Sequence, residues 1–169
     1  MNPSPKWFER KFDFSFPVEW YPSLMIRLRG TPAQLGELVQ ACSREVLVRK
    51  THDQWSAQEH AGHLLDLETL WIARAEDFAG NGTELTKADL SNRKTHEANH
   101  NARPIAAILA EFRQTRVRLL NSVEGKVPGE LGRSLLHPRL KEPMRLVDHL
   151  YFVAEHDDHH LARIWTLTQ

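Results

Sequence analysis

The chain lacks most features of a secreted, membrane-bound or nucleic-acid-binding protein. Cys42 is the only cysteine among 169 residues, which excludes an internal disulfide and favours a reducing cytoplasm. Basic and acidic residues number 22 each, so the chain has no broad positive potential for binding nucleic acids or anionic membranes. No run approaches the roughly 18 apolar residues of a membrane span, and residues 1–16 lack the apolar core of a signal peptide. We therefore expect a cytoplasmic protein with no nucleic-acid or membrane partner.

Strand and nucleotide-binding patterns are also missing. No segment alternates apolar and polar residues over several positions, and no Asn-Gly or Asp-Gly pair joins two β-rich runs, so strands are not expected. The absence of a glycine-rich phosphate-binding loop argues against a nucleotide cofactor. The length fits one domain, which we place at residues 1–169 with an irregular extension over residues 1–16.

Proline is absent between Ala33 and Arg103 and again after Met144, and apolar residues recur there at spacings of three and four. This pattern predicts helices. The first has Thr31 as N-cap and Pro32 at its first position, after a helical lead-in that Gly30 separates from it. The others run from Ser56, which forms a capping box with Glu59, to about Phe78, from residues 101–104 to about Val123, and from about Pro143 to Leu167. These four amphipathic helices favour an all-α four-helix bundle.

Histidine is the residue type in excess, with ten copies. His156 and His160 are four residues apart, so their rings project from one face of a helix and can bind one metal ion. They share a half-apolar stripe with Phe152 and Val153 that should face the bundle interior, whereas Asp157, Asp158 and His159 point elsewhere. The simpler interpretation is that these two histidines are solvated or hydrogen-bonded within the core. Their place on an inward-facing stripe argues against it.

The second predicted helix supplies a third ligand, and two histidines compete for that role. His60 lies nearer the centre of the apolar face and His63 nearer its edge. Periodicity favours His60 as the buried residue and does not settle the choice. Gly62 between them costs roughly 1 kcal/mol of helix stability relative to Ala, which a close approach of another helix or a ligand would explain.

The two histidine segments read WSAQEHAGHLLDLE at residues 55–68 and AEHDDHHLARI at residues 154–164. In this order and spacing they resemble the DinB-like family of metal-binding four-helix bundles, and the likeness covers most of the chain. The resemblance implies that His63, His156 and His160 are the metal ligands. It also implies nickel or zinc as the metal, an unusual bundle connectivity and a homodimer.

The resemblance says less about the reaction than about the metal. Members of the family resemble metal-dependent hydrolases, thiol S-transferases that use a low-molecular-weight thiol as cosubstrate, and maleylpyruvate isomerases. Three histidine ligands leave a divalent ion an open position, where it lowers the pKa of water to about 7. We therefore expect a hydrolase or thiol S-transferase that acts on a small-molecule substrate. A non-catalytic metal-binding or ligand-sensing bundle and a helical interaction module are the alternatives.

Several further residues have open roles. His96 and His100 lie in the long loop over residues 80–101 and form either a solvated pair or a lid, with Asn99 and Asn101, over the metal. Arg74 and Arg163 lie near the ligand stripes and either meet an anionic substrate or pair with acidic residues, and Asp66 either orients a ligand imidazole or faces solvent. Cys42 is predicted to be a small core residue. His60 and His149 are predicted to line or support the site. The tryptophans are predicted to be core or dimer-contact residues, at positions Trp7, Trp20, Trp71 and Trp165. No role is assigned to His52, His137 and His159.

Overall fold

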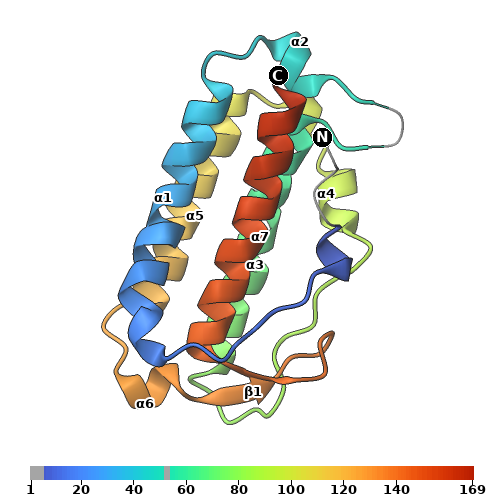
Figure 1. Ribbon diagram of the computed structural model, residues 1–169. Coiled ribbons are helices and arrows are strands. Elements are labelled where there is room, and N and C mark those ends of the chain that lie inside the picture. Colours follow the sequence, from blue (N-terminus) through green and yellow to red (C-terminus); the bar gives the residue numbers. More distant parts are fainter. Residues whose placement is uncertain (1–5, 52–53) are drawn as a thin grey trace.

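The computed structural model describes residues 6–51 and 54–169. Four long helices run side by side in it: α1 (Tyr21–Val39), α3 (Ala57–Asp77), α5 (Ile105–Val123) and α7 (Leu146–Leu167) (Figure 1). α1 packs against α5 and α7, and α3 packs against the same two helices. The predicted all-α four-helix bundle is confirmed, apart from one small strand pair. No helix in the described ranges is long and apolar enough to cross a membrane.

The first predicted helix boundary is wrong, because α1 continues through Gly30 and Pro32 as one helix. Proline within a helix removes the hydrogen bond to the carbonyl four residues earlier, here that of Leu28. Arg116 of α5 donates a hydrogen bond of 3.0 Å from NH1 to this carbonyl oxygen. A partner from another helix thus satisfies the group that Pro32 leaves free, and the helix need not restart at Thr31.

The α3 boundaries agree with the prediction. The Ser56 hydroxyl accepts from the Glu59 amide at 3.1 Å, and the Glu59 carboxylate accepts from the Ser56 amide at 2.8 Å. Phe78 is the C-cap. α5 begins directly after Pro104 and ends at Val123, as its pattern predicts.

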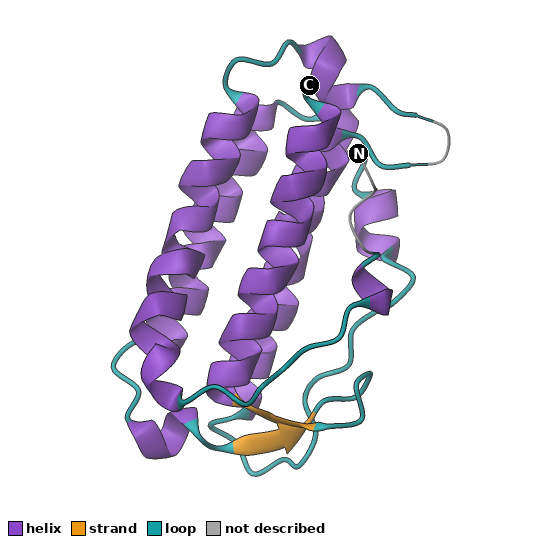
Figure 2. Ribbon diagram, viewed as in Figure 1, coloured by secondary structure: helices purple, strands orange, loops and turns teal. Residues whose placement is uncertain are grey.

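The absence of strands was a wrong prediction. β1 (Ser134–Leu136) and β2 (Pro143–Arg145) form a two-stranded antiparallel sheet at one end of the bundle, with the buried residues Leu135 and Met144 opposite each other (Figure 2). Three-residue strands are too short to show an alternating pattern. The fourth helix therefore starts at Leu146 rather than Pro143, where the Asp148 carboxylate accepts from the Arg145 amide at 2.8 Å.

Short elements connect these parts. Two 3-10 helices lie before α1. One short helix lies between α1 and α3, a short helix and a 3-10 helix lie between α3 and α5, and α6 precedes the sheet. They are η1 (Trp7–Glu9), η2 (Val18–Trp20), α2 (Arg44–Val48), α4 (Arg93–Glu97), η3 (His100–Ala102) and α6 (Pro128–Leu131). The loop over residues 80–101 is thus partly helical. The segment before α1 crosses α7, where Arg10 forms an ion pair with Glu155.

A buried charged network lies between two hydrophobic clusters of the bundle. Leu28, Trp71, Leu119 and Val153 belong to one cluster, and Leu35, Leu64, Phe112 and Leu161 belong to the other. Between them Arg116 contacts Glu68 at 2.6 Å and Asp157 at 2.6 Å. Thr31 donates to the same Asp157 carboxylate at 2.9 Å. All four long helices contribute a residue, and Asp157 is buried rather than pointing away from the interior as predicted.

Candidate metal centre

Three histidines from two helices meet inside the bundle. His63 of α3 and His156 and His160 of α7 are all buried, and one ring nitrogen of each lies within 4.8 Å of one nitrogen of the other two. The ring centroids are 4.7 Å apart for His63 and His160 and 4.5 Å apart for His156 and His160. The four-residue spacing places the second pair on one face of α7, and the packing of α3 against α7 adds His63.

Burial keeps these rings neutral at physiological pH. Desolvation lowers the pKa of His63 to about 4, although the nearby Asp66 carboxylate opposes the shift. Desolvation and repulsion from the neighbouring imidazoles lower the pKa of His156 and of His160 well below its ordinary value. A neutral imidazole has one unprotonated nitrogen whose lone pair is available to a metal ion.

A chain of hydrogen bonds holds the His63 ring in one tautomer. The Thr95 hydroxyl lies 3.0 Å from His63 Nδ1 and donates its single proton to Asp66 Oδ2 at 2.9 Å. Thr95 therefore accepts from His63, whose Nδ1 carries the ring proton and whose Nε2 keeps a lone pair. Asp66 supports the ring through this intermediate hydroxyl.

His100 belongs to the same series of hydrogen bonds. Its Nε2 donates to Asp66 Oδ2 at 2.8 Å, and these two groups together with Thr95 are buried. Although burial opposes the change, the hydrogen bonds from His100 and Thr95 lower the pKa of Asp66. The His100 ring lies directly on the backbone of Gly62, where a Cβ would stand 2.2 Å from its Cγ atom. The glycine thus allows the close approach of the loop, and His100 occupies a supporting position rather than a lid position.

His60 supports the third ring. Its Nδ1 lies 2.8 Å from His160 Nδ1, so one of the two nitrogens donates to the other. Desolvation, followed by repulsion from Arg163, lowers the pKa of His60 to about 3. The two histidines that compete in the sequence therefore hold different places: His63 lies with His156 and His160, and His60 lies behind His160.

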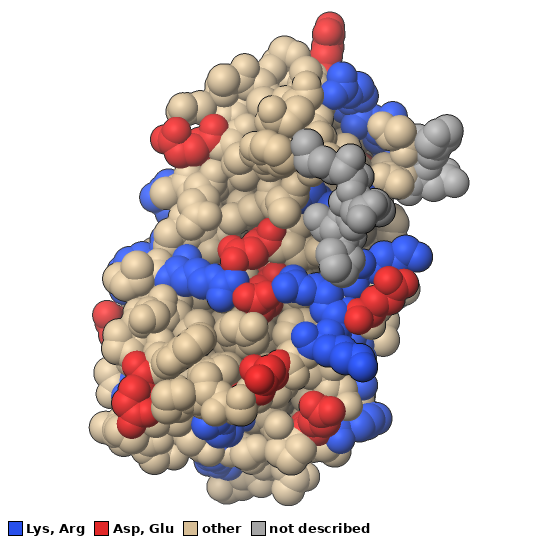
Figure 3. Space-filling view, viewed as in Figure 1, with Lys and Arg blue, Asp and Glu red and all other residues tan. Residues whose placement is uncertain are grey.

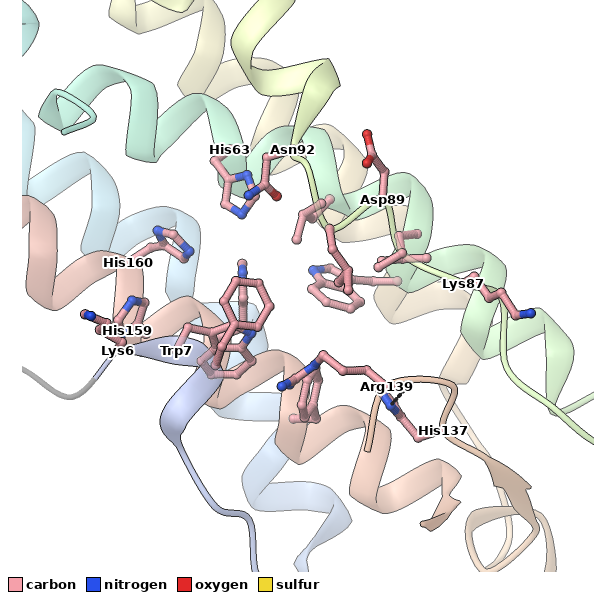
Figure 4. A pocket seen from close by; sticks show the side chains of 18 of the residues that line it. Lys6, Trp7, His63, Lys87, Asp89, Asn92, His137, Arg139, His159 and His160 are labelled. Atoms are coloured by element: carbon pink, nitrogen blue, oxygen red, sulfur yellow. Dashed lines mark hydrogen bonds between the residues drawn. The ribbon is translucent and has the colours of Figure 1, made fainter. Parts of the chain in front are cut away.

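The three histidines open into a cavity of about 930 Å³ (Figure 4). Trp55 and Trp7 flank them, with ring centroids 4.7 Å from His63 and 5.0 Å from His156 respectively. Leu67 and Phe152 add apolar wall, and His159 lines the cavity as well. Trp7, Thr95 and Arg139 are site residues that sequence reasoning missed, because contacts between distant segments bring them there. Trp55 directly precedes Ser56, the N-cap of α3, so the capping box also fixes the position of the Trp55 backbone.

Other predicted residues lie in varied surroundings. Arg74 and Arg163 both line the cavity, and Arg163 donates to Gln54 Oε1 at 3.1 Å. His149 is in the hydrophobic core, where it donates from Nε2 to the Trp71 carbonyl at 3.2 Å. His96 is exposed beside Trp55.

The remaining positions can be grouped by exposure. Trp71 is buried, Trp20 and Trp165 are about half exposed, and Cys42 is partly buried. His137 is buried at the cavity wall. His52 lies outside the described residues.

Comparison with known proteins agrees with this fold. A solved structure, YfiT from Bacillus subtilis, has a TM-score of 0.83 and 20% sequence identity to the chain, covering 94% of this chain and 91% of its own. It is described as a probable metal-dependent hydrolase with an unusual four-helix bundle topology. No curated protein matches the chain. The model of the DinB superfamily matches residues 27–164, which include His63, His156 and His160. The chain therefore belongs to the DinB superfamily.

Proposed function

We propose that this protein is a divalent-metal-dependent enzyme that acts on a small molecule, with His63, His156 and His160 as the metal ligands. The observation that supports the proposal most directly is the meeting of three buried, neutral imidazoles beside a cavity that extends to η1 and to the loop before α4. The fold likeness to a protein described as a probable metal-dependent hydrolase supports hydrolysis as the reaction class.

The donor set fits a divalent transition metal. Two imidazole nitrogens on one tetrahedral ion with bonds of about 2.0–2.1 Å lie roughly 3.4 Å apart, and the three nitrogens here lie within 4.8 Å of one another. His156 Nδ1 is buried and has no hydrogen-bond partner among the described residues, which fits a ring that interacts with a group from outside the chain. Nickel and zinc both suit an all-imidazole site.

The chain's own residues would orient the ligands and limit the access of water. Thr95 and His60 engage the Nδ1 atoms of His63 and His160, which leaves their Nε2 atoms as the ligand atoms. A bound ion of this kind supplies an activated water or thiol nucleophile. Trp7 and Trp55 would hold the apolar part of the substrate beside that nucleophile. A low-molecular-weight thiol as cosubstrate is the transferase form of the same proposal.

Metal content tests the proposal directly. Protein made without an affinity tag should contain about one divalent ion per chain, and His156→Ala should lose most of it. His96→Ala is the matched control, because His96 is exposed and lies outside the cavity lining. Equal, substoichiometric metal in the wild type and His156→Ala would overturn the metal site. Stoichiometric metal without hydrolysis of esters or amides and without thiol transfer would leave the ligand-sensing alternative.

The remaining expectations stay predictions. A homodimer, a cytoplasmic location and the absence of nucleic-acid binding rest on the family resemblance and on composition. Light scattering at several protein concentrations checks the dimer.

A further inference from the structure

We propose that Arg74 and Arg139 form a binding site for a substrate carboxylate, at the end of the cavity away from the three histidines. This inference rests on the proposed function, since it names the class of substrate that the metal site would act on. In Figure 4 Arg139 and His137 lie on the opposite side of the cavity from His63 and His160, and Arg74 also lines it.

Both guanidinium groups are shielded from solvent, fully or in part, without an ion pair to a carboxylate of the described residues. Arg74 is 2% exposed, and its Nε donates to the Thr86 carbonyl at 2.9 Å. Arg139 is partly buried, and its NH2 atom is buried without a hydrogen-bond partner among the described residues. Neither arginine forms a salt bridge to a carboxylate within the described ranges, and Asp77 acts on Arg74 only from beyond ion-pair distance, whereas Arg145 pairs with Asp148. A buried charge without a partner costs free energy that a bound anion recovers.

Hydrogen-bond donors are in excess around His137. Its Nδ1 accepts from the amides of Arg139 and Leu140 at 3.2 and 3.1 Å. The neutral ring therefore carries its proton on Nε2, which lies 3.1 Å from Arg74 NH1, another donor. Burial, followed by repulsion from Arg74 and Arg139, lowers the pKa of His137 to about 3 and keeps it neutral. Two donors that face each other need a common acceptor, and a carboxylate oxygen can accept from both.

More basic than acidic side chains line the cavity. Six Lys or Arg residues line it and only two acidic residues do, although the whole chain is neutral. Of the two, Glu9 lies 3.6 Å from Lys6, and Asp89 accepts from the Ser91 amide and the Arg93 amide. In Figure 3 Lys and Arg side chains form a band across the middle of the visible face and also lie along its right-hand side, with acidic side chains among them. A positive cavity raises the local concentration of an anionic substrate.

The side chains that line the cavity indicate what the rest of the substrate is like. Aromatic rings lie against both guanidinium groups, with Arg74 5.6 Å from the Trp71 centroid and Arg139 5.7 Å from the Phe152 centroid. Leu67 and Leu70 continue the apolar lining toward the histidines. This arrangement fits a small acid with an apolar body, whose carboxylate meets the arginines and whose reactive bond reaches the metal ligands.

Binding of a matched acid and amide tests the proposal. Titration calorimetry with 3-phenylpropionate and 3-phenylpropanamide, on the full chain as purified, should show the acid binding at least tenfold more tightly. Arg139→Met and Arg74→Met should each remove most of that preference, and Arg139→Lys should restore part of it. Arg113→Met is the control, since Arg113 is exposed and lies outside the cavity lining. If Arg74→Met does not fold, the partly buried Arg139 carries the test.

Chelation separates this inference from the metal site. The preference for the acid should persist after chelation and in His156→Ala, because the arginines and not the ion bind the carboxylate. A preference that survives in both arginine variants but is lost on chelation would overturn the proposal, as would equal binding of acid and amide. Inorganic phosphate competing better than acetate would overturn the carboxylate assignment. Wild-type protein that contains no metal as purified, yet shows an arginine-dependent preference, would refute the proposed function and leave this inference standing.

Discussion

Arg116 and Arg74 are both buried, at 1% and 2% exposure, and their surroundings are opposite. Arg116 meets two carboxylates, and although burial by itself acts against the charge, Asp157 and Glu68 raise its pKa. Burial and repulsion from Arg139 lower the pKa of Arg74 to about 10. The region around Arg116 is thus internally neutralised. Arg74 forms no ion pair within the described ranges, and the Asp77 carboxylate opposes the fall in its pKa only in part.

The difference separates a structural role from a binding role. The Arg116 network joins four helices and completes the backbone hydrogen bonding of α1 at Leu28. Among the described residues, the cavity side has one unpaired ring nitrogen on His156 and one unpaired guanidinium nitrogen on Arg139. Polar groups that the fold itself satisfies stabilise it, whereas polar groups left for an external partner are typical of a site.

Replacing Arg116 by Met should cause the largest loss of stability. Arg116→Met leaves two buried carboxylates and the Leu28 carbonyl without their partner, and we expect it to lower the free energy of unfolding by about 3–5 kcal/mol. Urea denaturation measures this change. Arg113→Met on the same helix is exposed and should change stability by less than about 0.5 kcal/mol. An Arg116→Met protein as stable as that control would contradict the structural role.

Gly62→Ala should disturb the cavity side without touching the network. The new Cβ would overlap the buried His100 ring, so we expect a loss of about 1–3 kcal/mol together with reduced metal content. Gly36→Ala in α1 is the matched control, because its Cβ meets nothing within 4 Å and should stabilise the helix by roughly 0.5–1 kcal/mol. A Gly62→Ala protein stabilised to the same extent would show that the His100 contact is unimportant.

Acid should lower the free energy of unfolding, in part because the buried His149 is neutral in the folded state. Burial, followed by repulsion from Arg74, lowers the pKa of His149 from 6.5 to about 3. Between these values the unfolded state binds a proton that the folded state does not, so stability falls as pH falls below 6.5, by about 1.4 kcal/mol per pH unit. His149→Gln should reduce the slope of unfolding free energy against pH by about that amount between pH 6 and pH 4. Above pH 7.5, where neither state is protonated, its slope should match that of the wild type, and an unchanged slope in acid would contradict the assignment.

The smallest effect is expected for Arg74→Met. This substitution removes a buried charge and strands no carboxylate, so the free energy of unfolding should change by less than about 1.5 kcal/mol in either direction. The same urea measurement as for Arg116→Met gives a direct contrast between identical substitutions. Equal costs at the two positions would remove the distinction between the two regions.

Local signals predicted much of the bundle and part of the site. The Ser56–Glu59 capping box specifies the start of α3, and the four-residue spacing brings His156 and His160 to one face of α7. Prediction failed where a distant group changed the local rule. Pro32 would end a helix unless Arg116 satisfied the carbonyl that it frees, and three-residue strands carry no pattern of their own.

The sequence by itself determined the helices and one histidine pair, because periodicity and caps act within a few residues. Periodicity favoured His60 as the buried residue without settling the choice, and only the family resemblance favoured His63. Tertiary structure alone separated them, by packing α3 against α7 and bringing Thr95 from the following loop onto His63. It also decided that Arg116 would be paired and Arg139 unpaired, because the identity of a charged group's neighbours depends on residues far away in the chain.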